Sequence, residues 1–513
     1  MISTDTLTDN ASPSKVAWTV IVIATVARLA VAAAFPLVPD ETYYWEWSRH
    51  LSFGYFDHPP AIAWCIAAGR ALLGDTPLGV RLVPVLCGTV AAVALMSAAR
   101  SIYDGMAAVR VALLFAVLPL SAAGLVLATP DAPLMAAAAI TVMAVVHAVD
   151  ELATPAVAFR WWCVAGVAAG AGMESKLTGV LLPAFIACAC VAIPSLRRVL
   201  RTPCPYAAVA IASIVVAPLL AWNSHHAWIT FGYQLTHGLG TPTQLSGGAI
   251  TKRLGNLAAG QLGLTAIILG MFMFGAVVRG VRGAFGFRAQ MLALTAALCL
   301  ALFTFSALRK PVEPNWPAIA YPAMIVLVAG MPLAPDARRW FDGGLAFAGA
   351  LSVAIYLYAT SVLPPVDVRG TRDPFSAAFG WEALADSVQA AQQSAAAAST
   401  GRQVLLAADR YQDASHIAFS GIGHPTVLSL DLAGRRNQYE LWPRYPDVAH
   451  VGDGLVVALD DTPERHAVIM ALEPHFESAM ELERVDLMHG PLVVGSRRLW
   501  VLRGWDGKWP QLQ

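Results

Sequence analysis

Long apolar runs recur through the first 363 residues of this chain, and they constrain its fold more than any other feature. A helix of about 20 apolar residues crosses a bilayer. The chain is 57% hydrophobic and only 13% charged, whereas soluble domains are about 25% charged. We therefore expect a polytopic α-helical membrane protein with about eleven spans, at 16–36, 79–99, 106–125, 132–149, 159–174, 177–194, 205–222, 262–279, 289–306, 316–333 and 342–363. The short runs 159–174 and 177–194 leave one broken helix as an alternative.

The chain changes character at Pro364 and Pro365. An alanine-rich stretch over 376–398 predicts a helix, and 413–419 predicts another. Alternation of helices with short apolar strands favours a small α/β domain. The sequence thus predicts a membrane domain at 1–363 and an α/β domain at 364–513, with strands at 404–406, 427–430, 455–458 and 499–502.

Charge and cysteine content exclude several classes of function. Lys and Arg balance Asp and Glu at 34 each, and no basic arm suggests a nucleic-acid partner. The seven cysteines all precede residue 300, mostly within apolar runs, and none has zinc-ligand spacing. The C-terminal domain therefore has no disulfide framework.

Basic residues set the expected orientation, because cytoplasmic loops are enriched in Lys and Arg. A cytoplasmic N-terminus and an odd number of spans place the C-terminal domain outside the cytoplasm. The inside loops would then carry Arg100, Arg110, Arg160, Arg197, Arg198, Arg201, Arg279, Arg282, Arg288, Arg338 and Arg339.

The first outside loop begins with an acidic pair, Asp40 and Glu41, directly after Pro39. A proline at a helix start and acidic residues in the first turn predict a helix here. Its aromatic residues Tyr43 and Tyr44 share a face with Asp40, so this helix is expected to lie on the membrane surface. The alternative is an interfacial aromatic helix in which Asp40 only caps the first turn.

Two further acidic positions are expected on the same side of the membrane. Tyr55, Asp57 and His58 precede a Pro-Pro pair, and Asp57 with His58 suits a metal or a phosphate. A structural, hydrogen-bonded histidine is the plainer interpretation. Asp131 lies between prolines at the start of a span, where an aspartate is often only a cap.

Cations also lie on this expected outer side, against the usual charge bias. They are Lys176, Arg309 and Lys310, and the last two precede Glu313, Asn315 and Trp316. Basic side chains near a span end can simply extend to the interface. A phosphate site is the alternative, because Lys binds phosphate as a point charge and Arg as a bidentate fork.

Carboxylates, cations and aromatic rings thus share one membrane face, which suits transfer of a sugar from a lipid-linked phosphate. A carboxylate activates a hydroxyl, and cations stabilise a departing phosphate.

At these residues the sequence resembles the GT-C membrane glycosyltransferases, in the branch that holds protein O-mannosyltransferases, the lipid A aminoarabinose transferase and galacturonosyltransferases. The resemblance covers nearly the whole chain. It rests on Pro39-Asp40-Glu41 with Tyr44, Tyr55 to Pro60, Thr129-Pro130-Asp131, Glu174-Ser175-Lys176, Lys310 to Pro317, Asp409 to Gln412 and Arg436 to Tyr439. It implies a GT-C fold with surface helices in the first outer loop.

The resemblance also implies roles. Asp40 inherits the catalytic base, Asp131 supports it, and Glu41 is the neighbouring candidate. Lys176 and Lys310, with Arg309, would bind the donor phosphate. The remaining candidates, for binding the substrates, are Tyr43, Tyr44, Tyr55, Asp57, His58, Glu313, Asn315 and Trp316.

Two departures separate this chain from the aminoarabinose branch, which has arginine at the position of Tyr43 and lysine at that of His58. The Asp57-His58 pair is closer to the galacturonosyl and uncharacterised bacterial members. The resemblance requires no cofactor, and it allows a divalent ion at Asp57 and His226.

The sequence therefore predicts an inverting glycosyltransferase at the periplasmic membrane face. Its partners would be a polyprenyl-phosphate hexose or pentose as donor and lipid A, lipopolysaccharide, another glycan or a protein as acceptor. The alternative is a transporter or flippase of lipid-linked sugars. Transporters carry ionisable residues near the bilayer midplane, often with inverted repeats, and Arg28 in the first span is the feature that fits this alternative best.

Overall fold

A computed structural model describes residues 12–151, 153–239, 247–365, 375–399, 401–430, 432 and 435–510. Their contacts divide the chain into two compact units. The helical unit comprises residues up to Ala33, then Ser52–Gly74 and Arg81–Tyr356. The tail unit comprises Ala34–Leu51, Asp75–Val80 and the chain from Leu357. The sequence predicted domains of 1–363 and 364–513, and the tail unit also takes in two segments of the first outer loop.

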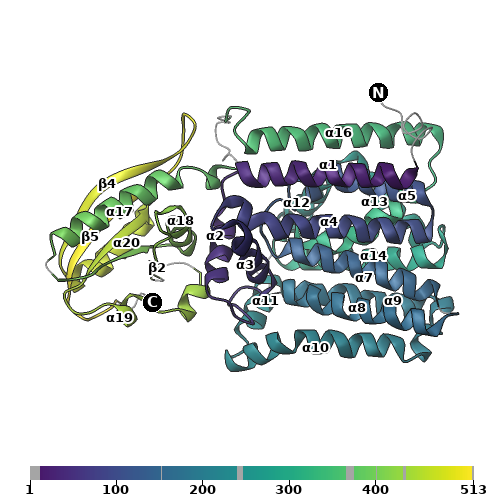
Figure 1. Cartoon of the computed structure of the whole chain (residues 1–513), viewed down its shortest axis with the longest axis horizontal. Coiled ribbons are helices and arrows are strands. Elements are labelled where there is room, and N and C mark those ends of the chain that lie inside the picture. The colour runs from purple at the N-terminus through teal and green to yellow at the C-terminus, as the bar shows by residue number, and fades with distance from the viewer. Residues whose placement is uncertain are drawn as a thin grey trace. The chain divides into compact units, whose positions relative to one another are not determined.

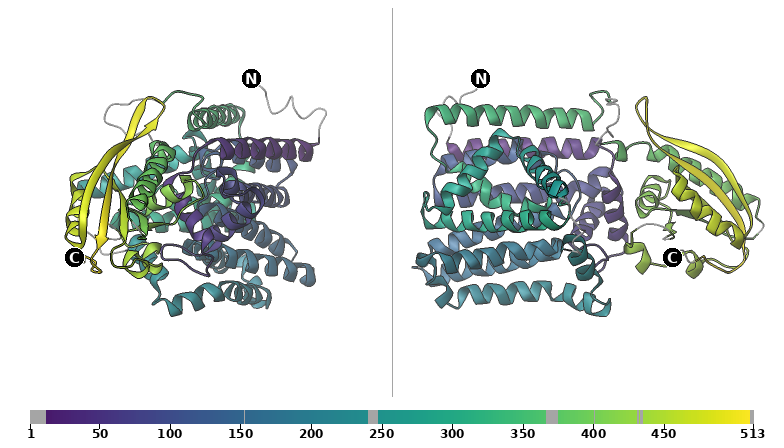
Figure 2. Two further views of the ribbon diagram at one scale, coloured as in Figure 1. Left: turned by 60° about the vertical axis from the view of Figure 1, so that its left-hand side comes forward. Right: turned by 180° about the vertical axis from the view of Figure 1, so that it is seen from behind.

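The helical unit is a bundle whose long helices pack side by side, with α8 between α7 and α10 (Figures 1 and 2). Apolar side chains dominate these helices because lipid solvates their outer surfaces. The helices are α1 (Pro13–Ala34), α3 (Ala61–Leu73), α4 (Pro77–Ile102), α5 (Gly105–Val117), α6 (Pro119–Ala122), α7 (Asp131–Asp150), α8 (Pro155–Ser175), α9 (Leu181–Ala192), α10 (Cys204–His225), α11 (Ile229–Leu239), α12 (Gly247–Leu264), α13 (Ile268–Val281), α14 (Gly286–Arg309), α15 (Tyr321–Ala329) and α16 (Pro335–Ala359). Short 3-10 turns include η1 (Leu177–Val180) and η4 (Trp316–Ala320).

A polytopic helical membrane protein is confirmed, but the count of eleven spans is not. Within the described residues, seven helices are long and apolar enough to cross a membrane, and two bent pairs raise this to at most nine. One bent pair is α12 with α13, where Ala266 and Ile267 adopt positive φ angles and the direction changes by 106°. The predicted span 106–125 is also interrupted, because Pro119 follows the end of α5 and disfavours a helical residue before it.

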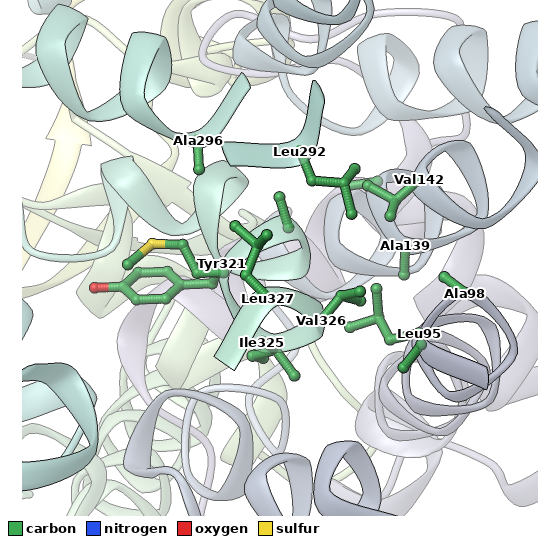
Figure 3. Packing of buried hydrophobic residues seen from close by; sticks show 14 of the residues in the cluster. Leu95, Ala98, Ala139, Val142, Leu292, Ala296, Tyr321, Ile325, Val326 and Leu327 are labelled. Atoms are coloured by element: carbon green, nitrogen blue, oxygen red, sulfur yellow. The ribbon is translucent and has the colours of Figure 1, made fainter. Parts of the chain in front are cut away.

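The core of the helical unit is a continuous layer of buried apolar residues. Figure 3 shows side chains of α4, α7, α14 and α15 meeting there. Helix α15 is buried along its whole length, so it is surrounded by protein rather than by lipid. The labelled residues are Leu95, Ala98, Ala139, Val142, Leu292, Ala296, Tyr321, Ile325, Val326 and Leu327.

The tail unit is built on a five-stranded sheet in the order β2-β1-β3-β5-β4. Strand β1 pairs in parallel with β2 and β3, while β5 pairs antiparallel with β3 and β4. The strands are β1 (Val404–Ala408), β2 (Val427–Ser429), β3 (Gly454–Asp460), β4 (Phe476–His489) and β5 (Leu492–Trp505). Figure 2 shows β4 and β5 as a long curved hairpin.

Helices pack against this sheet and complete an α/β unit, as predicted. Residues of α20 join one buried cluster with Leu455 and Val457 of β3, while α17 and α18 contact β1. The predicted helix at 376–398 is α17 and starts at Trp381, and that at 413–419 is α18. The helices of this unit are α2 (Pro39–Arg49), α17 (Trp381–Ala397), α18 (Tyr411–Ser420), α19 (Tyr445–Val448) and α20 (Pro463–Leu472).

Candidate functional site

Three predicted site residues of the helical unit meet in one cluster. The Lys176 ammonium lies 2.9 Å from Asp131 Oδ1. The Asn315 side-chain amide donates to the other oxygen, Asp131 Oδ2, at 2.7 Å. The Lys176 side chain is only 9% exposed and that of Asp131 18%. Asp131 therefore holds a nearly buried cation and an amide at fixed positions.

Each member of this cluster lies at the end of a helical element. Asp131 is the first residue of α7, and Lys176 directly follows α8. Gly179 packs η1 closely onto α8, because a Cβ at this position would overlap the backbone of Gly172. Asn315 precedes η4. The ends of four elements thus bring together residues that lie far apart in the sequence.

The predicted cations Arg309 and Lys310 end helix α14. Lys310 Nζ donates to the Thr236 carbonyl of α11 at 2.5 Å, and the Arg309 carbonyl accepts from Arg253 at 2.8 Å. Arg309 Nε is buried and has no hydrogen-bond partner within the described part of the chain. Helices α11 and α12 therefore hold this basic pair in place.

The segment after the basic pair is held by Gln261 of α12, which the sequence did not single out. Its amide donates to the Pro314 carbonyl at 2.9 Å and accepts from the Tyr321 hydroxyl at 2.6 Å. Trp316 packs against the apolar core, while Glu313 is exposed. Gln261 thereby fixes the loop that presents Asn315.

A second missed residue, Gln234 of α11, holds the Asp57-His58 turn. Its side-chain amide donates to the Asp57 carbonyl at 2.5 Å and lies 3.2 Å from His58 Nδ1. The Tyr55 carbonyl accepts from the Thr230 hydroxyl at 2.6 Å, also on α11. A glutamine within a helix of a long loop forms no recognisable motif, so nothing in the sequence pointed to it.

An apolar cavity of about 460 Å³ lies between α7, α8, α9 and α10. Met173 and Val180, which line it, flank Lys176 in the sequence. Its wall also includes Thr141, Trp162, Cys190 and Phe231. A lining of this kind suits an apolar chain, and the cavity borders the segment that carries the buried cation.

The acidic helix α2 belongs to the tail unit. The Glu41 carboxylate accepts from the Val38 backbone N–H at 3.0 Å and so caps its own helix. The Tyr43 hydroxyl accepts from the Gln438 N–H at 2.7 Å, and the Tyr43 ring lies 4.4 Å from that of Tyr411. Residues from Glu41 to Ser48 are all buried, and the predicted helix at this position is confirmed as α2.

Asp40 differs from its helical neighbours because it is exposed to solvent. Surrounding protein raises the pKa of its carboxyl group, Arg435 opposes this rise, and Glu41 adds to it. A raised pKa makes the Asp40 carboxylate more basic, which suits a group that accepts a proton.

The sequence allowed a divalent ion at Asp57 and His226, and the structure shows the surroundings of His226. The His226 Nδ1 atom lies 2.8 Å from the Trp222 carbonyl, and its ring stacks on that of Trp222. Among the residues that the structure describes, no group of three or more His, Cys, Asp or Glu side chains is arranged to hold a metal.

A helical membrane unit followed by an α/β tail is the architecture of the GT-C glycosyltransferases, and the comparisons with known proteins confirm the predicted resemblance to this class. Residues 57–222 match the family described as dolichyl-phosphate-mannose-protein mannosyltransferase. The structure of ArnT from Cupriavidus metallidurans bound to undecaprenyl phosphate superposes with a TM-score of 0.68 at 15% identity, covering 96% of this chain and 98% of that one.

Two curated relatives are similar in sequence. Lipid A galacturonosyltransferase RgtD from Rhizobium johnstonii is 29% identical over 289 residues, which is 56% of this chain and 59% of that protein. Undecaprenyl phosphate-alpha-4-amino-4-deoxy-L-arabinose arabinosyl transferase 1 from Pseudomonas fluorescens is 30% identical over 164 residues, or 29% of each chain. The matched regions thus span less than two thirds of either relative.

Proposed function

We propose that this protein transfers a sugar from a polyprenyl-phosphate donor to lipid A at the periplasmic face of a bacterial inner membrane. The relatives named above are a lipid A galacturonosyltransferase and an arabinosyl transferase that uses an undecaprenyl-phosphate sugar. The protein with a similar fold binds undecaprenyl phosphate. These names support a lipid-linked donor and a lipid A acceptor for this chain.

The observation that carries the proposal is the nearly buried Lys176, in a segment whose residues Met173 and Val180 line the apolar cavity. An ammonium bound by one carboxylate oxygen keeps two further N–H donors, since a lysine has three. These donors suit the phosphate of the donor, while the cavity suits its hydrocarbon chain. A water-soluble donor would need no such cavity, so the pairing of cation and cavity favours a lipid phosphate.

The proposed reaction is a single displacement. The Asp40 carboxylate takes the proton from an acceptor hydroxyl, whose oxygen forms a new bond to the anomeric carbon. The bond from that carbon to the phosphate oxygen breaks, and polyprenyl phosphate leaves with the electron pair. Lys176 stabilises the leaving anion, helped by Arg309 and Lys310. Attack opposite the leaving group inverts the anomeric configuration.

The test is a transfer assay with the purified full-length protein in lipid nanodiscs. Undecaprenyl-phosphate sugars, each radiolabelled in the sugar, are offered with lipid A, and the product is separated and analysed. We expect labelled lipid A with one donor of the set and inversion at its anomeric carbon. Labelled donor that crosses a liposome membrane without covalent transfer would instead establish a flippase.

A further inference from the structure

The tail unit contains a second cavity, of about 230 Å³, which the proposed chemistry does not use. We call it the arginine pocket. Four guanidinium groups line it, together with an aromatic ring and a buried carboxylate: Arg410, Arg435, Arg436, Arg465, Tyr411 and Asp409. It is smaller than the 300–1,000 Å³ typical of drug-sized ligands, so it suits one sugar ring with its charged substituent.

The lining is positively charged on balance. Its only carboxylates among the described residues are Asp409 and Glu440, against four arginines. Arg436 pairs with Glu440 at 2.7 Å, and Arg465 pairs with Asp409 at 3.3 Å. Arg435 donates to the Tyr411 hydroxyl at 2.7 Å and lies over its ring. Guanidinium forks match the oxygen pairs of phosphate and carboxylate groups.

The same pocket also offers acceptors for hydroxyl groups. The Asp409 side chain is fully shielded from solvent, and within the described part of the chain neither of its oxygens accepts a hydrogen bond. Its Oδ2 atom lies 3.3 Å from the Arg465 guanidinium, so this carboxylate holds an arginine at the pocket wall. Tyr411 adds an aromatic surface, and Asn437 and Ser429 add further polar groups.

The arginine pocket is fixed to the helix that carries Asp40. Tyr43 of α2 accepts the Gln438 N–H and stacks on Tyr439, next to the pocket residue Asn437. Arg435, a lining residue, is close enough to Asp40 to lower the pKa of its carboxyl group. A ligand held in the pocket is therefore positioned relative to Asp40.

We propose that the arginine pocket binds an acidic sugar of the acceptor, a pyranose that carries a phosphate or a carboxylate. This assignment rests on the proposed function for the identity of the acceptor, and on the pocket alone for the chemistry of its ligand. The pocket recognises the acceptor by its charge, and α2 presents Asp40 to a hydroxyl of the bound glycolipid.

Binding is tested by calorimetry with the full-length protein in nanodiscs. The probes are glucosamine 1-phosphate and galacturonate, with galactose as the neutral sugar and inorganic phosphate as the simple anion. We expect at least one acidic sugar to bind more tightly than galactose and phosphate. Equal binding of galactose, equal binding of phosphate, or no binding of either acidic sugar would overturn the proposal.

Arg436→Gln is the informative variant, because this side chain is 71% exposed and its loss should not disturb folding. Arg444→Gln is its matched control: Arg444 is 55% exposed, pairs with Asp447 in the same unit and does not line the pocket. Loss of a hydrogen bond to a charged group should weaken binding of the acidic sugar about tenfold in Arg436→Gln. The proposal fails if Arg436→Gln binds like wild type, or if Arg444→Gln loses as much affinity.

Steady-state kinetics distinguishes a pocket that binds the acceptor from one that binds the donor. In Arg436→Gln the KM for the acceptor should rise about tenfold, with kcat and the KM for the donor unchanged. A raised KM for the donor with an unchanged KM for the acceptor would show that the pocket binds the donor, and would overturn the assignment.

Failure of the pocket assignment and failure of the proposed function give different results. Turnover without binding of either acidic sugar rejects the pocket assignment and leaves the proposed function intact. Binding that depends on Arg436, without transfer from any donor, rejects the proposed function and its acceptor assignment together.

Discussion

Lys176 is oriented by its neighbours independently of any ligand. Its ion pair with Asp131 and the hydrogen bond from Asn315 to the same carboxylate restrict all three side chains. Preorganised charge of this kind stabilises a developing anion without further reorganisation. The geometry therefore makes Lys176 the residue whose removal should affect the donor most.

We predict that Lys176→Ala lowers kcat/KM for the donor about tenfold or more, because hydrogen bonds to charged groups contribute roughly 1.5–3 kcal/mol. Steady-state kinetics with a varied donor concentration measures this. Lys508→Ala, which changes an exposed lysine of the tail unit, is the control and should match wild type. Unchanged kinetics in Lys176→Ala would remove this residue from the phosphate site.

Asp40→Asn should reduce transfer about 10²–10⁴-fold, the usual contribution of a general base. Asparagine keeps the shape and can still cap a helix, so binding of the donor should persist. Glu41→Gln should retain most activity, since a glutamine oxygen can still accept the Val38 N–H that Glu41 binds. If Glu41→Gln is inactive and Asp40→Asn is active, the base is Glu41.

Several site residues could be predicted at this scale because they form local motifs. Asp131, Lys176 and Asn315 were chosen from the sequence, and the structure places them in contact. Their roles stay predictions. Gln234 and Gln261 could not be chosen, because each acts through a backbone carbonyl distant in sequence, and such contacts leave no local pattern.

At the scale of elements, buried hydrogen bonds tie helix α2 to the rest of the tail unit, among them that of Thr42 with Ser415. The Tyr43 hydroxyl accepts from the backbone N–H of Gln438. Tyr43 was predicted to bind substrate, and its hydrogen bond to Gln438 indicates that it also stabilises the tail unit.

We predict that Tyr43→Phe costs about 1–3 kcal/mol locally, because the buried N–H loses its acceptor. Hydrogen exchange at Gln438, followed by mass spectrometry, should accelerate about tenfold or more. Tyr206→Phe removes an exposed hydroxyl that donates to Leu200 in the helical unit and should leave this exchange unchanged. Protection at Gln438 that survives Tyr43→Phe would contradict the structural role.

Asp409, at the end of β1, gives the tail unit a dependence on pH. Burial and the neighbouring Asp413 raise the pKa of Asp409 to about 7, and Arg465 and Arg497 only partly oppose this. The unfolded carboxyl group has a pKa near 3.9. The folded state therefore binds more protons between roughly pH 4 and 7, and stability contributed by this group falls as the pH rises through that range.

The corresponding prediction is that Asp409→Asn melts at a higher temperature than wild type at pH 8, with a smaller difference at pH 5. Apparent melting temperatures of the full-length protein in detergent measure it. Asp386→Asn changes an exposed aspartate of α17 and should follow wild type at both values. If the difference in melting temperature between Asp409→Asn and wild type is larger at pH 5 than at pH 8, the predicted direction of the pH dependence is wrong.

Most elements could be predicted from apolar runs, and the exceptions have physical causes. The bend between α12 and α13 depends on positive φ angles at Ala266 and Ile267, which neither residue type favours. Strand β4 was missed because most of its residues are exposed and many are charged. Its pairing with β5, rather than its own composition, makes it a strand.

At the scale of the whole molecule, the predicted orientation puts the tail unit outside the cytoplasm. Alkaline phosphatase fused after Gln513 should therefore be active in a bacterial host, because the enzyme folds only in the periplasm. The same reporter inserted after Leu333, before α16, should be inactive, because α16 is long and apolar enough to cross the membrane. The reverse pattern would overturn the orientation.

The composition of the tail unit from separate segments could not be predicted. Sequence patterns detect elements and local motifs, whereas the contact from Tyr43 to Gln438 joins residues 395 positions apart. The boundary near residue 364 marks where apolar runs end. This boundary in composition does not indicate that Ala34–Leu51 belongs to the same compact unit as the tail.

The distance in sequence between Tyr43 and Gln438 also delays the contact between them during synthesis of the chain. Ribosomes add about 5–20 residues per second, so the partner of Tyr43 is made roughly 20–80 s after Tyr43 itself, given their separation of 395 positions. During that interval the aromatic residues of α2, which end up buried, have no tail to cover them. We therefore expect the lipid interface, or a chaperone, to shield this Tyr- and Trp-rich segment of the nascent chain until translation is almost complete.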